Sequence, residues 1–253
     1  MRDGFLAYIA GSRSGMPAAV ESVPQRVPGS RRVDLLQHDP ELSRLLAPSG
    51  LKGPGAALPA VALRLERGPW QPGADAPSYD HLGFLVLDGL LGRRVLVPER
   101  GRSLELLGKG DIFRPWQEDS PSFSEVTWTV IEPASIAVLD GEFKERAKEV
   151  PELMELFAER ALRRSRRLAA IAAIANTVGV EERLVLLLWQ LAELWGRKTP
   201  EGALLPFRLS HQTLADLVGA RRPTVTLAMR SLSERGAVRR RESGEWILTG
   251  APP

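Results

Sequence analysis

The spacing of apolar residues changes near residue 140, and this change constrains the fold more than any other feature of the sequence. Upstream, Val126, Trp128 and Val130 alternate with threonines, which is the period of a half-buried β-strand. Downstream, Leu153 and Phe157 lie four residues apart, which is the period of an amphipathic helix. The chain of 253 residues is therefore predicted to be an α+β protein, with its strands in the first half and its helices in the second.

Short apolar segments separated by turn residues make up the first half. Residues 1–48 are rich in Gly, Pro, Ser and Ala, and we expect a flexible arm there with a short helix around Asp39–Leu46. Further along, Asp88–Gly89 is a typical hairpin turn. Short strands spaced about 8 to 12 residues apart indicate a sandwich or barrel. The predicted strands cover residues 61–65, 83–87, 91–97, 103–107, 126–130 and 136–139.

A long helix is expected to begin at Pro151, since proline is favoured in the first turn of a helix. Its apolar stripe is long enough to need a partner helix, so we predict a homodimer. The predicted dimer interface comprises Leu153, Phe157, Leu168, Ile171 and Ala175. The same helix carries a run of arginines, which we expect to form its solvated flank: Arg160, Arg163, Arg164, Arg166 and Arg167. A second helix is predicted over 181–195.

The last fifty residues have the pattern of a winged helix-turn-helix. Ser210 is a natural N-cap for a short helix over 212–218, and Gly219 makes a tight turn. A second helix begins near Arg221, and a β-hairpin over 238–248 follows it. The core of the helix pair is predicted to be Leu214, Leu217, Val218, Val225, Ala228 and Leu232.

Positive charge is concentrated in the same module. From Pro206 onward the chain has eight basic and four acidic residues, whereas the rest has 26 and 27. A basic terminal module indicates a polyanionic partner, and the helix pattern favours double-stranded DNA over a merely solvated basic face. The residues expected to face the major groove are Arg221, Arg222, Thr224, Thr226, Leu227 and Arg230.

Several function classes are excluded by composition. The chain has no cysteine, and its three histidines, His38, His81 and His211, are far apart, so we predict no metal site and no cofactor. No phosphate-binding loop, dinucleotide-binding or nucleophile-elbow motif occurs, so we predict that the chain is not an enzyme. The longest apolar run, residues 168–175, is far shorter than the roughly 20 residues that span a bilayer. We therefore predict a cytoplasmic protein without a membrane partner.

The stretch LSHQTLADLVGARRPTVTLAMRSLSERGAV, Leu209–Val238, resembles the C-terminal domain of the cyclic-AMP receptor protein (Crp/Fnr) family of bacterial transcription regulators. Upstream, Gly83–Asp111 is similar to the β-roll pattern of that family, including a Gly–Asp pair shortly before a Phe. The resemblance implies an N-terminal β-roll of the cyclic-nucleotide-binding jelly-roll kind, a long dimerisation helix and a winged helix-turn-helix. The corresponding regions are an arm (1–48), a β-roll (49–147), dimerisation and linker helices (148–197) and a DNA-binding domain (198–253).

The resemblance also assigns roles within the DNA-binding domain. Arg222 falls where the family has a guanine-reading arginine, whereas Pro223 and Leu227 replace two other base readers, so the operator is expected to differ from the family consensus. The residues at phosphate-contact positions, including those of the wing, are Ser210, His211, Gln212, Arg239, Arg240 and Arg241. RNA polymerase is the further macromolecular partner that the resemblance implies.

The ligand cassette of the family is degenerate here. The family has a Gly–Glu pair after the Gly–Asp–Phe turn and then an arginine that binds the cyclic phosphate, but here Arg114–Pro115–Trp116 follows Phe113. No basic residue occurs between Arg114 and Lys144, so we predict no response to cyclic AMP. Arg114 and Trp116 are candidates to line a pocket for an unknown small-molecule effector. The alternatives are that they pack the roll, and that the roll is a protein-interaction scaffold.

Overall fold

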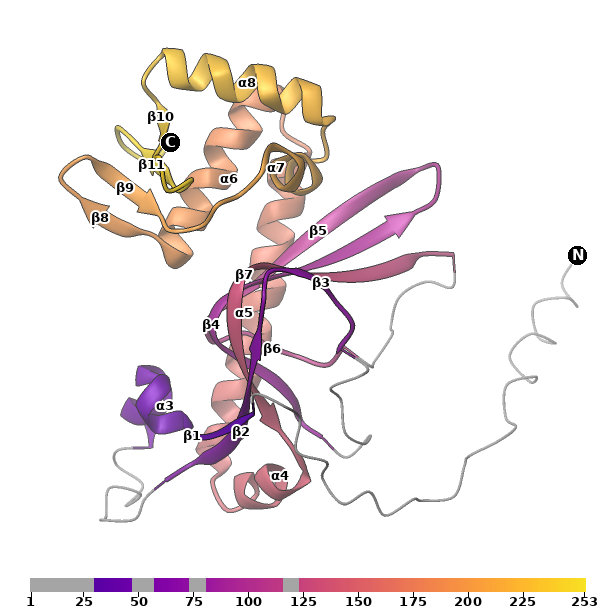
Figure 1. The fold of residues 1–253 in the computed structure, drawn as a ribbon, viewed down its shortest axis with the longest axis vertical. Coiled ribbons are helices and arrows are strands. Elements are labelled where there is room, and N and C mark those ends of the chain that lie inside the picture. The colour runs from indigo at the N-terminus through magenta and orange to yellow at the C-terminus, as the bar shows by residue number, and fades with distance from the viewer. Residues whose placement is uncertain (1–29, 47–56, 73–80, 116–122) are drawn as a thin grey trace, which may run out of the picture.

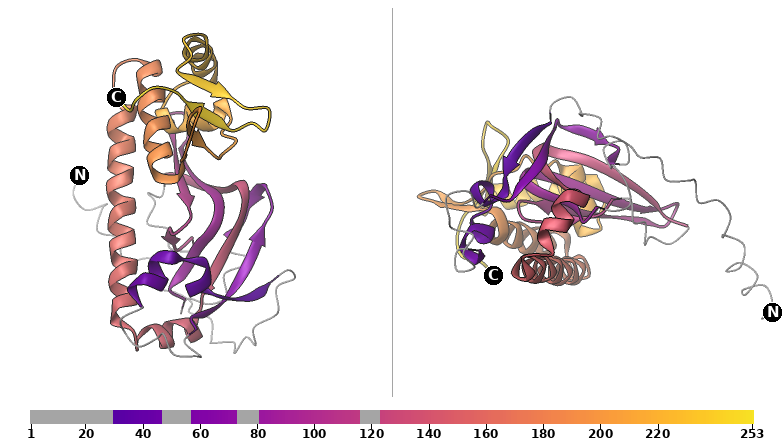
Figure 2. Two further views of the ribbon diagram at one scale, coloured as in Figure 1. Left: turned by 90° about the vertical axis from the view of Figure 1, so that its left-hand side faces the viewer. Right: turned by 90° about the horizontal axis from the view of Figure 1, so that it is seen from below.

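The structure is a computed structural model that describes residues 30–46, 57–72, 81–115 and 123–253. A β-roll lies at one end and the helix-turn-helix region at the other, and one long helix runs along both (Figures 1 and 2). The predicted α+β class, with a β-roll, a long helix and a winged helix-turn-helix, is confirmed.

The β-roll is an antiparallel sheet whose central strands are two long curved ones. The strand order is β1-β2-β7-β4-β5, and the short strands β3 and β6 pair with β7 and β4. The strands are β1 (Arg31–Asp34), β2 (Pro59–Leu65), β3 (Gly68–Trp70), β4 (Gly83–Val97), β5 (Gly101–Gly108), β6 (Ile112–Phe113) and β7 (Glu125–Leu139).

The prediction of a hairpin turn at Asp88–Gly89 is wrong, because these two residues lie within the continuous strand β4 and bend it. β4 and β7 pair along their length, and their register shifts on both sides of Asp88. Gly89 has φ +86°, and a Cβ there would lie 2.3 Å from the carbonyl oxygen of Pro133. Only glycine fits this close approach, so the dipeptide makes a bulge that curves the sheet.

In the described part of residues 1–48, the short helix expected around Asp39–Leu46 is confirmed as α3, whereas the flexible arm expected around it is wrong for residues 31–38. Residues 31–45 form β1, which pairs with β2, and two short helices, α2 (Leu35–His38) and α3 (Pro40–Leu45). The side chain of Asp39 caps α3 by accepting hydrogen bonds from the amides of Glu41 and Leu42. Leu42 is fully buried in a core shared by the roll and the long helix. Residues 1–29 lie outside the described part.

Helices dominate the rest of the chain. The long helix, α5, begins at Pro151 as predicted, and α6 matches the second predicted helix. Residues 199–206, expected to be a connector, contain a strand that joins the wing in a four-stranded sheet ordered β10-β11-β9-β8. The elements are α4 (Gly141–Ala147), α5 (Pro151–Ala175), α6 (Val180–Trp195), β8 (Arg197–Thr199), β9 (Gly202–Leu205), α7 (His211–Val218), α8 (Arg222–Glu234), β10 (Val238–Arg240) and β11 (Trp246–Leu248).

The arginine run of α5 does not form a solvated flank, because three of its members face the β-roll. The side chain of Arg160 is 5% exposed and donates hydrogen bonds to both carboxylate oxygens of Asp39, at 2.6 and 2.9 Å. Arg164 pairs with Glu105 of β5, and Arg167 pairs with Asp111 at 2.8 Å. The acidic partners are distant in sequence, so helical periodicity alone gives no sign of them.

The predicted dimer interface is wrong for three of its five residues. Leu153 and Phe157 are buried in the core between α5 and the base of the roll, and Ile171 is buried in the core of the DNA-binding region. These side chains pack within one protomer and are not available to a second copy. Leu168, in contrast, remains 37% exposed.

The buried ion pair between Asp39 and Arg160 is expected to stabilise the folded protein. Replacing Asp39 by Asn leaves a buried guanidinium without a full counter-charge, and we expect a loss of about 3–5 kcal/mol in the free energy of unfolding, measured by urea denaturation. Glu159→Gln, which breaks the exposed pair of Glu159 with Arg166, is the control and should cost less than about 1 kcal/mol. Equal losses in the two variants would contradict the role of the buried pair.

The same carboxylate sets a pH dependence. Burial raises the pKa of Asp39, but the hydrogen bonds and charge of Arg160 and the two backbone amides outweigh it and hold the pKa below the ordinary value. Its contribution to stability is therefore complete above the unfolded-state pKa of about 3.9 and is lost as the pH falls through the lower folded-state pKa. The Asn variant should lack this part of the acid dependence.

Candidate nucleic-acid interface

The helix pair α7–α8 has the geometry that the sequence predicts. The Ser210 hydroxyl accepts a hydrogen bond from the Thr213 amide at 3.0 Å and caps α7. Gly219 ends α7 in the left-handed region with φ +63°, where glycine is favoured. All six predicted core residues are buried, so the helices hold each other in a fixed relation. A rigid pair can present one surface reproducibly to a ligand.

The outer face of α8 carries the residues expected to face the major groove. Arg221 is the N-cap of α8, and Arg222 is its first residue. Leu227, 69% exposed, lies one turn further along the helix, and Arg230 pairs with Glu234 at the exposed surface. All six candidates are exposed, and α8 lies at the outer end of the molecule (Figure 1). The structure therefore brings them onto one accessible face.

The start of α7 is joined to α8 and the wing through His211. Its ring lies 6.2 Å from that of Trp246 in a stacked arrangement, and its Nδ1 lies 3.0 Å from the Thr226 hydroxyl. Burial and the positive charges of Arg240 and Arg222 lower the pKa of His211. The lowered pKa favours the neutral imidazole at neutral pH.

The wing arginines are engaged with a residue that the sequence pattern did not single out. Arg239 and Arg241 both pair with Glu201, in the turn between β8 and β9. The Arg240 guanidinium lies 5.5 Å from the centre of the Trp246 ring. The sequence pattern showed no sign of the β8–β9 hairpin, and the position of Glu201 opposite the wing was therefore not predicted.

A buried carboxylate on α7, Asp216, fastens the DNA-binding region to the β-roll. Its side chain is 1% exposed and lies 2.9 Å from Arg94 of β4 and 2.5 Å from Arg102 of β5. It also accepts a hydrogen bond at 2.7 Å from Gln212, one of the expected phosphate contacts. Leu104 and other residues of the β4–β5 hairpin belong to the same apolar core as α7 and α8. We call this cluster of Asp216, Arg94 and Arg102 the hairpin clamp.

The interior of the β-roll is filled by aromatic side chains. Phe113 stacks on Trp128 with ring centres 5.1 Å apart, and Trp70 and Phe84 pack against the same pair. Arg114 is exposed, and its Nε donates a hydrogen bond at 2.8 Å to the Leu82 carbonyl. It lines a cavity of about 560 Å³ between the roll and α5. Trp116, its expected companion, lies outside the described residues.

Residues 30–46, 57–72, 81–115 and 123–253 contain no group of three or more His, Asp or Glu side chains placed to hold a metal ion. Within the same ranges, every helix is too short or too polar to cross a bilayer.

Comparison with known proteins supports the geometry. Residues 182–249 match the family model described as a Crp-like helix-turn-helix domain. No curated protein matches the sequence. Three similar structures are FixK2 from Bradyrhizobium japonicum (16% identity, 76% of this chain and 93% of that one, TM-score 0.57), a mutant of CooA from Carboxydothermus hydrogenoformans (21%, 75% and 83%, 0.55) and a CRP-family transcriptional regulator from Thermus thermophilus (18%, 74% and 91%, 0.54).

A winged helix-turn-helix with an exposed basic helix, carried on a β-roll and a long helix, defines a DNA-binding transcription regulator. Residues 182–249 are thus similar to the Crp-like helix-turn-helix domain, and the described chain shares the fold of these three structures.

The hairpin clamp makes a testable prediction. Asp216→Asn removes the negative charge that Arg94 and Arg102 share, so the contact between α7 and the β4–β5 hairpin should loosen. We expect faster amide hydrogen exchange in α7 and in the hairpin together, while α4 at the far end of the roll stays unchanged.

Glu234→Gln, which breaks an exposed pair on α8, is the matched control and should leave both segments unchanged. Faster exchange in α7 without any change in the hairpin would show that the clamp does not join the two parts.

Proposed function

We propose that this protein is a homodimeric regulator that binds a specific DNA operator in the cytoplasm and acts with RNA polymerase. The observation that carries the proposal is the outer face of α8, where Arg221 and Arg222 stand at the start of an exposed helix backed by a buried core. In this arrangement the first residues of the second helix reach base edges in the major groove. Regulators of this family are generally not enzymes, and we propose no catalytic role.

Within that interface, the contacts divide into two kinds. Arg222 is proposed to read a guanine, since an arginine fork matches the two acceptors of that base. Arg239, Arg240 and Arg241, together with Ser210, His211 and Gln212, are proposed to contact phosphates, which position the protein without reading sequence. Glu201 competes with the backbone phosphates for two of the wing arginines.

The exposed face of α5 is proposed to bind α5 of a second copy. Met154, Leu162 and Leu168 are 42%, 53% and 37% exposed, and each is an apolar side chain on this helix. Exposed small residues continue the same face. The resulting row has alternating spacings of four and three residues and consists of Met154, Ala158, Ala161, Ser165, Leu168 and Ala172. This spacing is that of a coiled-coil seam, and its small residues let two helices approach closely. A two-fold axis along the seam would relate two copies of the chain, so that the dimer would present two copies of α8 to DNA.

The β-roll is proposed not to bind cyclic AMP. The ring cluster around Phe113 and Trp128 fills the roll, and the cassette lacks the glutamate and arginine that the family uses. A small-molecule effector of another kind is therefore the further partner that we propose.

The first test separates base readout from phosphate contact. Arg222→Ala should weaken binding to the best operator by about 1–3 kcal/mol and relax the preference at one base pair per half-site. Arg239→Ala should weaken specific and scrambled duplexes alike and reduce the salt slope by about one unit. Titrations of both duplexes at several salt concentrations, with an operator selected from random DNA, measure these effects. If Arg222→Ala weakened the two duplexes equally, Arg222 would not read a base.

The second test concerns the dimer. Leu168→Glu places a charge in the proposed seam and should convert a particle of twice the chain mass into one of 27.8 kDa, measured by light scattering. Ala170→Glu, an exposed position on the opposite side of α5, is the matched control and should leave the mass unchanged. A wild-type mass of 27.8 kDa at micromolar concentration would overturn the proposal.

A further inference from the structure

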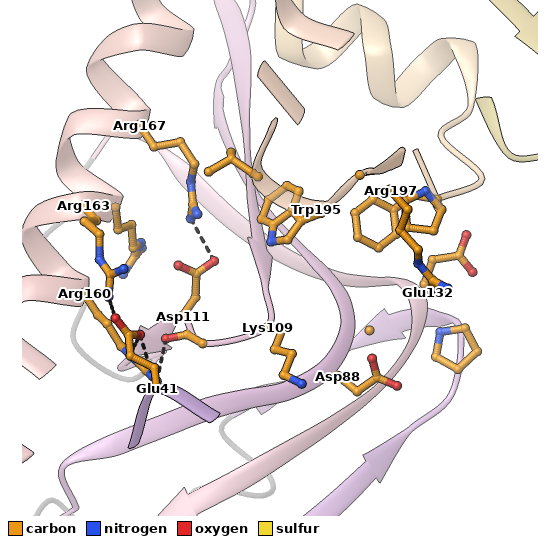
Figure 3. Close-up of a pocket in the computed structure, with 18 residues that line it drawn as sticks. Glu41, Asp88, Lys109, Asp111, Glu132, Arg160, Arg163, Arg167, Trp195 and Arg197 are labelled. Atoms are coloured by element: carbon orange, nitrogen blue, oxygen red, sulfur yellow. Dashed lines mark hydrogen bonds and ion pairs between the residues drawn. The ribbon is translucent and has the colours of Figure 1, made fainter. Parts of the chain in front are cut away.

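A cavity of about 790 Å³ lies where the β-roll, α5 and the DNA-binding region meet (Figure 3). It is separate from the Arg114 cavity except that the side chain of Arg164 borders both. Its walls come from α3 and α5, the turn after β5, the bulge at Gly89, and the junction of α6 with β8. Its volume is within the range of about 300–1,000 Å³ that small-molecule sites occupy.

One wall presents Lys109 on a rigid turn. The Asp111 carboxylate accepts a hydrogen bond from the Gly108 amide at 2.8 Å and pairs with Arg167 of α5. The Gly110 amide donates to the Val86 carbonyl at 2.8 Å, and Gly110 has φ +89°. The turn is therefore held at both ends, and Lys109 projects from it between Asp111 and Asp88 (Figure 3).

The opposite wall presents Arg197, directly after α6. The ring of Trp195 packs so closely on Gly108 that a Cβ there would lie 2.7 Å from the indole. Arg167 lies over the same ring, 5.3 Å from its centre, and Phe207 meets it edge-on. Trp195 therefore holds the end of α6 against the β-roll, and this contact fixes the position of Arg197 two residues later.

Two of the cations that line the cavity lack an ion pair within the described ranges, whereas the others are paired with carboxylates inside or just outside the lining. Six basic and four acidic side chains line it. Glu41 and Asp111 are already held by arginines of α5, and Glu132 is held by Arg67. Among the described residues, neither Lys109 nor Arg197 forms an ion pair, although the carboxylates of Asp88 and Glu132 also line the cavity. Two such cations on facing walls of one cavity give it a positive potential that favours a bound anion.

We propose that this cavity binds a small organic anion with two or more phosphate or carboxylate groups, held by Lys109 on one side and Arg197 on the other. The proposal rests on the proposed effector response and names the chemistry and place of that effector. Arg163 and Arg167 keep their carboxylate partners and add to the positive potential of the site. Because Lys109 belongs to the β-roll and Arg197 to the matched helix-turn-helix domain (182–249), a ligand that joins them stabilises one arrangement of the two parts.

The test is calorimetric titration of the full chain with inorganic pyrophosphate and, separately, with citrate. At least one of the two anions should bind the wild type. Tighter binding of pyrophosphate would indicate a phosphate ligand, and tighter binding of citrate a carboxylate ligand. The double variant Lys109→Gln/Arg197→Gln should weaken that binding by at least about tenfold, since each lost charge removes a charge-assisted hydrogen bond. Cyclic AMP, titrated in the same way, should give no heat.

Three controls locate the site. Lys198→Gln removes an exposed cation beside Arg197 that does not line the cavity, and it should leave the affinity unchanged. Arg114→Gln and Arg222→Ala should also leave it unchanged, because they lie in the smaller cavity and on α8. Loss of binding in any of these variants, unchanged binding in the double variant, or no binding of either anion to the wild type overturns the proposal. The DNA titrations of Arg222→Ala are read independently, so failure of one proposal leaves the other intact.

Discussion

The arrangement of the molecule depends on the arginine–carboxylate pairs that bind α5 to the β-roll. Arg160, Arg164 and Arg167 lie one turn or so apart on one side of the helix and meet Asp39, Glu105 and Asp111. Paired charges at partly buried sites tolerate little displacement, because a broken pair leaves a desolvated charge behind. The helix is thereby held in one rotation about its axis. That rotation determines which side chains of α5 enter the protomer core and which remain exposed.

Local signals in the sequence were sufficient for the helix pair of the DNA-binding domain. Ser210, Gly219 and the apolar spacing of α7 and α8 act over a few residues, so the cap, the turn and the core of the helix pair were all predicted from them. The basic face of α8 followed, because a helix with one buried side exposes the other. The likeness to the family added the β-roll and its position in the chain.

Long-range contacts account for what the sequence did not show. Asp88–Gly89 has the composition of a hairpin turn, and only the approach of Pro133 from β7 reveals a bulge. Residues 31–38 lack a periodic pattern, yet the pairing of β1 with β2 gives them structure, and only the short helix after them was expected. The helix α5 carries two apolar stripes, one buried within the protomer and one exposed. Both have helical spacing, so spacing alone does not show which stripe packs on the roll. Asp216 and Glu201 were missed for the same reason, since their partners lie on other elements.

The pairing of Glu201 with Arg239 and Arg241 has a consequence for how the protein is distributed in a cell. Glu201 acts as an internal counter-ion, and under the proposed phosphate contacts any DNA duplex would have to displace it to reach those two arginines. The cost is the same for every sequence, so discrimination between operator and bulk DNA is unaffected, while attachment to bulk DNA becomes weaker in absolute terms. Because a chromosome offers a vast excess of unspecific sites, such a penalty leaves more of the regulator free to search for its operator.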